Sequence, residues 1–222
     1  MIGAVVFDLD GVIVDSEHVW DAAREALARE QGGRWDENAQ RDMMGMSSVE
    51  WSRYMHEVIG LEDPPEEISA AVVRRLEAIY REELPLIDGA SEAVAGLAER
   101  WPLGVASSSN RPIIDLVLNL SGLDRYFRVT VSSEEVPRGK PSPDVYLEAA
   151  RRLGSDPKET AAIEDSNNGI LSARAAGMRV IAIPNMRYPP GEEALAEADV
   201  VLRSISELTP AVVEGGAGGS HP

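Results

Sequence analysis

The 222-residue chain contains no cysteine, which excludes disulfide bonds, thiolate metal sites and a cysteine nucleophile. Lysine is nearly absent. Of the 21 lysine and arginine residues, only Lys140 and Lys158 are lysines. No apolar run approaches the ~18 residues that a membrane-spanning helix requires. No basic segment with a cleavage site precedes the first apolar run. We therefore expect a soluble, cytoplasmic protein.

Positive charge is scarce throughout the chain, whose formal net charge is −17. This excess of acidic groups disfavours nucleic acids and anionic membranes as partners. A hydrophobic content of 44% with 27% charged residues is typical of soluble globular proteins, and the length suffices for a full core. The oligomeric state stays open, and a monomer is compatible with these numbers.

Two carboxylates follow the first apolar run. Residues 4–7 (Ala-Val-Val-Phe) are typical of a buried strand in a parallel sheet, and Asp8 and Asp10 come directly afterwards. Side chains alternate along a strand, so these two carboxylates lean to the same side. Gly11 lets the backbone turn away and a ligand approach. Buried carboxylates require a cation or donors, although Asp-Gly alone is also a common turn signal.

The remaining pattern divides the chain into a helical part and an alternating part. From Pro85 onward, helices and strands alternate, which predicts a parallel sheet with helices on both faces. The expected strands after the first are 102–107, 127–132, 160–164, 178–183 and 199–202. The expected helices are 16–31, 36–44, 47–59 and 65–84 in the first part, then 89–100, 111–120, 142–153 and 167–176.

We interpret this division as two domains in an α/β protein. A discontinuous, Rossmann-like core would consist of residues 1–14 and 86–212. The helical block 15–85 would then be a small cap domain inserted after the first strand. The glycine-rich segment 213–222 is typical of a flexible tail.

Polar residues recur after later apolar runs. Ser107 ends one run and begins Ser-Ser-Ser-Asn110, Lys140 stands before a proline, and Glu164-Asp165 ends another run. Taken singly, these are compatible with helix caps and an exposed loop lysine. Ligands of open α/β sheets bind at the carboxyl ends of the strands. A hydroxyl, an ammonium and several carboxylates at that edge together predict one site.

In this order, the motifs resemble those of the haloacid dehalogenase (HAD) superfamily of phosphotransferases, with Asp8-Leu-Asp10-Gly11, then Ser107, Lys140-Pro141 and Glu164-Asp165. The resemblance spans residues 1 to about 205. The helical block resembles the cap of the branch that contains phosphoglycolate phosphatases, sugar-phosphate phosphatases and β-phosphoglucomutases. This resemblance implies an enzyme, a Mg²⁺-dependent hydrolase of small phosphorylated metabolites.

The resemblance also implies roles for the acidic residues. Asp8 would be the nucleophile that forms an aspartyl-phosphate, and Asp10 would act as general acid and then general base. Mg²⁺, a cation that prefers hard oxygen ligands, would be held by Asp8, the backbone carbonyl of Asp10 and Asp165. Glu164 would lie near the metal or bind it through water.

By the same resemblance, Ser107, Ser108 and Lys140 would bind phosphoryl oxygens. Lys140 would also neutralise developing charge as a compact ammonium, a task less suited to the broad arginine fork. Substrate specificity is expected from the cap and the loops near it. The candidate specificity residues are Trp20, Gly45, Met46 and Asn110.

Three alternatives to a phosphatase differ in what they require. Dehalogenases of this superfamily lack the second aspartate, whereas Asp10 is present. β-Phosphoglucomutases carry an arginine in a cap segment resembling Gly-x-Ser-Arg and a histidine after the first motif, but this chain has Ser48 and Trp20 there. A phosphomutase therefore remains the alternative, and a non-catalytic module that binds metal or phosphate is the second one.

Overall fold

The first apolar run forms strand β1 (Ala4–Phe7), which lies inside a six-stranded sheet in the computed structural model. The structure describes residues 1–36, 38–43 and 46–215. Every neighbouring pair of strands is parallel, in the order β3-β2-β1-β4-β5-β6. The other strands are β2 (Leu103–Ser107), β3 (Phe127–Ser132), β4 (Thr160–Glu164), β5 (Arg179–Ala182) and β6 (Val200–Val201).

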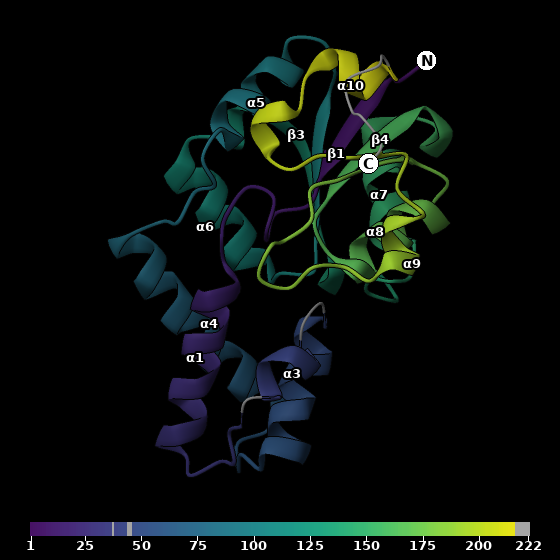
Figure 1. Ribbon diagram of the computed structural model, residues 1–222. Coiled ribbons are helices and arrows are strands. Elements are labelled where there is room, and N and C mark those ends of the chain that lie inside the picture. The colour runs from purple at the N-terminus through teal and green to yellow at the C-terminus, as the bar shows by residue number, and fades with distance from the viewer. Residues whose placement is uncertain (37, 44–45, 216–222) are drawn as a thin grey trace.

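Helices cover both faces of this sheet (Figure 1). Side chains alternate along β1, so Val5 and Phe7 pack into one apolar cluster and Val6 into a second cluster on the opposite face. The first cluster includes residues of α5 (Ala90–Ala98), α6 (Arg111–Ser121) and α10 (Pro210–Glu214). The second includes residues of α7 (Asp144–Leu153), α8 (Asn167–Ala175) and α9 (Glu192–Leu195). The Rossmann-like α/β fold predicted from the sequence is confirmed.

The segment between β1 and α5 lies below the sheet in Figure 1, and its regular elements are helical in the part that the structure describes. Trp51, Met55, Leu76 and Tyr80 are fully buried within it. Its elements are α1 (Glu17–Glu30), α2 (Ala39–Met43), α3 (Ser48–Tyr54), a π-helical turn (Met55–Ile59) and α4 (Pro65–Glu82). Among the described helices, none is both long and apolar enough to traverse a bilayer.

The two connections between this helical segment and the sheet run side by side. The amide of Asp15 donates to the carbonyl of Pro85 at 2.8 Å, and the amide of Ile87 donates to the carbonyl of Ile13 at 3.0 Å. We therefore propose the domain division expected from the sequence. Residues 15–85 form the cap, and the core begins with 1–14 and resumes at 86.

The expected boundary of the tail at residue 213 is too early. Pro210 begins α10, Thr209 accepts a hydrogen bond from the amide of Val212, and Val213 is fully buried against the core. An apolar valine pair after a capping threonine and a proline continues the packed core despite the glycines that follow. Residues 216–222 lie outside the described residues.

A glycine lets α8 approach the end of β4 closely. A Cβ atom on Gly169 would lie 1.9 Å from the carboxylate carbon of Glu164. Gly96 in α5 is a matched position, because a Cβ atom there would meet nothing within 4 Å. The packing of α8 therefore depends on Gly169, whereas α5 does not depend on Gly96.

We expect Gly169→Ala to lower the free energy of unfolding by about 1–3 kcal/mol, because the added methyl overpacks a buried carboxylate. Gly96→Ala should raise it by up to about 1 kcal/mol, since alanine is the better helix former. Urea unfolding measures both variants. Equal midpoints for the two would show that α8 tolerates a side chain at this contact.

Candidate active site

The loops after β1 and β4 meet at the carboxyl edge of the sheet. Asp8 follows β1 directly, and Asp165 follows β4. Gly11 adopts a φ of 78°, and a Cβ atom there would lie 1.8 Å from a carboxylate oxygen of Asp165. The glycine therefore permits both the turn and the close approach of these two loops.

Three carboxylates gather at this edge of the sheet. Oxygen atoms of Asp8, Glu164 and Asp165 lie within 4.8 Å of one another, and all three residues are buried. Burial, together with the neighbouring carboxylates, raises the pKa of Asp8 to about 8. The same causes raise the pKa of Asp165 well above its ordinary value. A cation held by these oxygens would relieve both effects, so the cluster suits a metal that prefers oxygen ligands.

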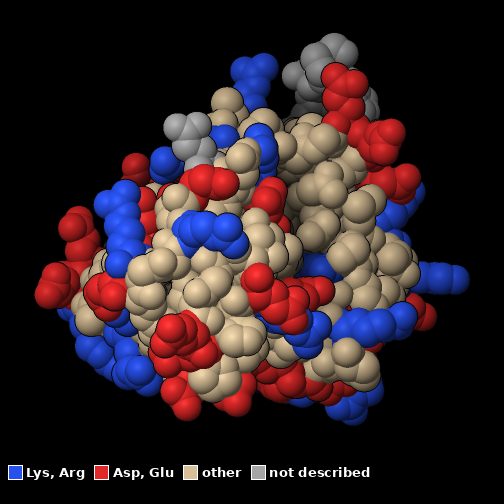
Figure 2. All heavy atoms as spheres, turned by 90° about the horizontal axis from the view of Figure 1, so that it is seen from below, with Lys and Arg blue, Asp and Glu red and all other residues tan. Residues whose placement is uncertain are grey.

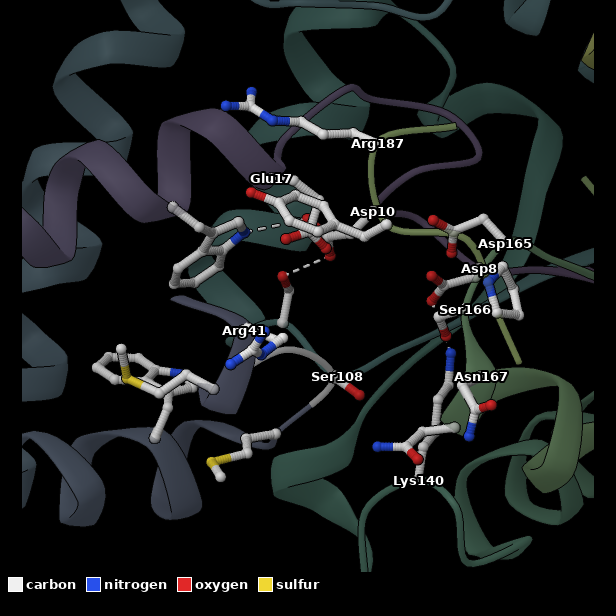
Figure 3. A pocket seen from close by; sticks show the side chains of 18 of the residues that line it. Asp8, Asp10, Glu17, Arg41, Ser108, Lys140, Asp165, Ser166, Asn167 and Arg187 are labelled. Atoms are coloured by element: carbon white, nitrogen blue, oxygen red, sulfur yellow. Dashed lines mark hydrogen bonds and ion pairs between the residues drawn. The ribbon is translucent and has the colours of Figure 1, made fainter. Parts of the chain in front are cut away.

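Lys140 is the ammonium buried inside this cluster. Its Nζ donates to Oδ1 of Asp8 at 2.7 Å and to Oε1 of Glu164 at 2.6 Å. The ring of Tyr146 lies 5.0 Å from Nζ. Burial by itself would lower the pKa of Lys140, but the two carboxylates raise it above its usual value. A permanent positive charge therefore stands beside Asp8 (Figure 3).

Glu164 is engaged by donors on both of its oxygens. Oε1 accepts from Lys140 and from the hydroxyl of Tyr146 at 2.7 Å. Oε2 accepts from the amides of Asp165 and Ser166 and from the Ser166 hydroxyl, at 3.1–3.2 Å. This carboxylate positions Lys140 and the start of α8. Its expected place near the metal stays a prediction.

Asp10 connects the core loops with the first cap helix. Its Oδ1 accepts from the Ser16 hydroxyl at 2.6 Å and from Nε1 of Trp20 at 3.1 Å. Its Oδ2 accepts from the hydroxyls of Ser109 at 2.7 Å and Ser107 at 3.3 Å. Four donors from two parts of the chain thus hold the carboxylate of Asp10 beside the cavity that Asp8 lines.

This cavity has a volume of about 440 Å³ and is lined by both the core and the cap. Figure 3 shows Asp8, Asp165 and Lys140 together on one side, and Asp10 with Glu17 on another. Apolar side chains of the cap form much of the remaining wall. These are Trp20, Met43, Met46 and Trp51.

The sequence-predicted residues fall into two groups in the structure. The cavity is lined by Asp8, Asp10, Trp20, Met46, Ser108, Lys140 and Asp165.

Three further predicted residues do not line this cavity. Glu164 is fully buried and binds Lys140. Ser107 is fully buried, and its hydroxyl donates to Asp10 instead of lining the cavity wall. The side-chain nitrogen of Asn110, Nδ2, donates to Glu134 and Ser69. Asn110 lines a second cavity with these two residues. The side chain of Asn110 thus turns toward α4 and the segment after β3 and does not line the cavity with Asp8. Its expected role in specificity stays a prediction. Gly45 lies outside the described residues.

The sequence reasoning missed charged residues on α1. Glu17 and Arg24 line the cavity together with Trp20, and the spacing of three and then four residues places all of them on one helix face. Burial and the nearby carboxylate of Asp10 raise the pKa of Glu17 to about 7, while Arg24 opposes that rise. The signal was available, because charged residues interrupt an otherwise apolar helix face. Ser109, Arg41 and Arg187 also line the cavity.

Comparison with known proteins identifies the family of this chain. A model of haloacid dehalogenase-like hydrolases matches residues 2–177. The chain belongs to this family. The expectation of an enzyme of the HAD hydrolase class is thereby confirmed.

Relatives and solved structures agree with this assignment. Hexitol phosphatase B of Escherichia coli is 32% identical over 93% of this chain and 94% of its own length. CbbY of Rhodobacter sphaeroides, solved in complex with xylulose-(1,5)bisphosphate, is 30% identical with a TM-score of 0.84, covering 94% of this chain and 96% of that one. A putative β-phosphoglucomutase of Thermotoga maritima is 27% identical with a TM-score of 0.74, covering 96% and 99%.

A divalent cation should stabilise the folded protein measurably. A ligand that binds only the folded state adds about 2.7 kcal/mol at a hundredfold excess over its Kd, and we expect MgCl₂ to raise the Tm accordingly. In Asp165→Asn this rise should disappear, whereas Asp124→Asn, an exposed aspartate far from the cluster, should retain it. Differential scanning fluorimetry with and without EDTA measures both. An undiminished rise in Asp165→Asn would remove Asp165 from the metal site.

Proposed function

We propose that this protein is a Mg²⁺-dependent phosphatase that hydrolyses a small phosphorylated metabolite, such as a sugar phosphate, through an aspartyl-phosphate on Asp8. The observation that carries the proposal is the 2.7 Å contact between the Asp8 carboxylate and the buried ammonium of Lys140 at the wall of a 440 Å³ cavity. A cavity of this size accommodates a small ligand. The name of the hexitol phosphatase relative indicates a substrate of that size.

In the first step, a carboxylate oxygen of Asp8 attacks phosphorus and the bond from phosphorus to the ester oxygen breaks. Asp10 gives a proton to the leaving oxygen, so that the alcohol departs neutral. Its carboxyl group, held at the wall of the same cavity as Asp8 by donors from Ser16 and Trp20, supports this role. Such proton transfer typically contributes about 10²–10⁴-fold to the rate.

In the second step, Asp10 takes a proton from water as that water attacks the aspartyl-phosphate. The bond between phosphorus and the Asp8 oxygen breaks, inorganic phosphate leaves, and both side chains return to their starting states. Lys140 carries a fixed positive charge that balances the phosphoryl oxygens in both steps. Ser108 lines the cavity where it can bind one of those oxygens.

Asp8, Asp165 and the backbone carbonyl of Asp10 would hold Mg²⁺ in this proposal. When bound, the ion supplies positive charge that offsets the clustered carboxylates and the phosphoryl oxygens. The raised pKa values of Asp8 and Asp165 support this assignment, because a cation stabilises their ionised forms.

A phosphomutase is the second candidate, favoured by the likeness to the putative β-phosphoglucomutase of Thermotoga maritima. A mutase must retain the intermediate against water and return the phosphoryl group to a second position. Against a mutase, Trp20 occupies the position where those enzymes carry a histidine, and its Nε1 donates to Asp10. The assay that separates the two follows inorganic phosphate and glucose 6-phosphate from β-glucose 1-phosphate with trace bisphosphate. Phosphate release supports the phosphatase, and isomerisation supports the mutase.

Asp8→Asn should abolish the release of p-nitrophenol from p-nitrophenyl phosphate with MgCl₂, because the amide oxygen is a poor nucleophile. Asp124→Asn serves as the matched control and should retain wild-type turnover. The Tm of each variant reports whether the fold is intact. Residual activity of more than a few per cent in a folded Asp8→Asn protein would rule out the covalent mechanism.

The two lysines of the chain provide a matched pair for a second test. Lys140→Arg should lower kcat by ~10²-fold or more, because the larger planar group neither fits between Asp8 and Glu164 nor acts as a compact charge. Lys158→Arg, in an exposed 3₁₀ turn (Pro157–Glu159), should leave kcat unchanged. Near wild-type kinetics for Lys140→Arg would show that the ammonium has no specific part in turnover.

A further inference from the structure

A guanidinium group is buried at the cap end of the cavity. Arg24, on α1, is 6% exposed and contributes to the cavity wall. Its terminal carbon lies 4.9 Å from the centre of the Trp20 ring and 5.0 Å from the centre of the Trp51 ring. The guanidinium therefore packs against both rings, whose centres lie 5.9 Å apart.

This guanidinium has few polar partners. Nη1 donates a long hydrogen bond of 3.4 Å to the side-chain oxygen of Gln40, and the buried Nε has no hydrogen-bond partner among the residues that the structure describes. Among the ion pairs of the described residues, none involves Arg24. Glu17 is near, but its carboxylate accepts from the amide nitrogen of Gln40 at 3.2 Å, so Gln40 links the two charged groups.

The charge of Arg24 is therefore only partly compensated. Burial lowers the pKa of Arg24 to about 10, which leaves the group protonated near neutral pH. A buried charge without a direct counter-ion is costly, and an arginine fork matches the oxygens of a carboxylate or a phosphate. Such a group lining a ligand cavity points to an anion that arrives with the ligand.

Two further arginines line the same cavity, although the chain carries a net charge of −17. In Figure 3, Arg187 lies on one side of Glu17 and Asp10, and Arg41 lies on the other. Both are exposed. Figure 2, which views the molecule from below Figure 1, shows basic side chains interspersed with acidic ones on this face. Positive charge is therefore present in the cavity wall despite the negative net charge of the chain.

We propose that Arg24 binds a second anionic group of the substrate, a phosphate or a carboxylate, at the end of the molecule distant from the phosphoryl group that Asp8 attacks. The inference rests on the proposed phosphatase function and narrows its substrate class to compounds with two anionic ends. Trp20 and Trp51 flank the guanidinium and exclude water from that contact.

A neutral hydroxyl satisfies this position less well than an anion. Arginine only donates hydrogen bonds, so a hydroxyl would fill one donor and leave the positive charge uncompensated. An anionic oxygen provides both acceptor and counter-charge, and such charge-assisted bonds are about twice as strong as neutral ones. Arg24 is therefore a specificity-determining residue and takes no part in the bond-breaking steps.

The test uses two pairs of compounds that differ at the distal end only. One pair is 3-phosphoglycerate and glycerol 3-phosphate, which differ by a carboxylate. The other is fructose 1,6-bisphosphate and fructose 6-phosphate, which differ by a phosphate. Each compound is measured as a competitive inhibitor of p-nitrophenyl phosphate hydrolysis by the full-length protein with MgCl₂, so that a Ki results whether or not the compound is turned over.

For the wild-type protein, we expect the member with two anionic groups, in at least one pair, to bind about 10-fold or more tightly than the member with one, as charge-assisted bonds predict. The pair that shows this ratio identifies the distal group as a carboxylate or a phosphate. In Arg24→Met the ratio should fall to about 1. Arg75→Met, a cap arginine that pairs with Glu30 at the surface, is the matched control and should keep the wild-type ratio.

Arg24→Lys keeps the charge but loses the planar fork, and its ratio should fall between those of Arg24→Met and the wild type. This variant carries the test if Arg24→Met is unfolded at the assay temperature, as its Tm reports. A wild-type protein that discriminates neither pair, or an Arg24 variant that keeps the full ratio, overturns the inference and leaves Arg24 a structural part of the cap. A wild-type protein without p-nitrophenyl phosphate turnover would instead refute the proposed function itself.

Discussion

One buried ammonium organises the carboxyl edge of this sheet. Lys140 lies within 2.7 Å of carboxylate oxygens from two strand ends, and its charge allows Asp8, Glu164 and Asp165 to be buried together. One positive charge against three carboxylates still leaves an excess of negative charge, as the raised pKa values of Asp8 and Asp165 indicate. The site therefore suits a further cation, and Lys140 holds one oxygen of Asp8 in a defined position.

The supporting residues explain why this arrangement is rigid. Glu164 accepts hydrogen bonds on both oxygens and so holds Lys140 from the side opposite to Asp8. Gly169 makes room for that carboxylate where α8 begins its first turns. Asp10, in contrast, is held by donors from the cap as well as the core, through Trp20 and Ser109. The acid that would serve the leaving group thus depends on where the cap lies.

The cap contributes chemistry of a different kind from the core. Its side of the cavity is built from aromatic and sulfur-containing side chains around the buried guanidinium of Arg24. In the proposed reaction this wall would contact the far end of the substrate, whereas Asp8 and Lys140 would contact the phosphate ester group that all such substrates share. One core could thus serve different substrates when the cap residues change.

The sequence by itself determined the alternation of strands and helices, the insertion after β1 and the residues that follow the strand ends. These features are local, since apolar runs, glycines and prolines act on neighbouring residues. Only the tertiary structure decided which side chains share the cavity. It turned Asn110 away and buried Ser107 under Asp10, while it brought Glu17 and Arg24 from α1 to the wall. The local pattern of α1 indicated that Glu17 and Arg24 share a helix face. Which group each side chain meets depends on contacts between segments far apart in the chain, because packing between helices and loops sets those orientations.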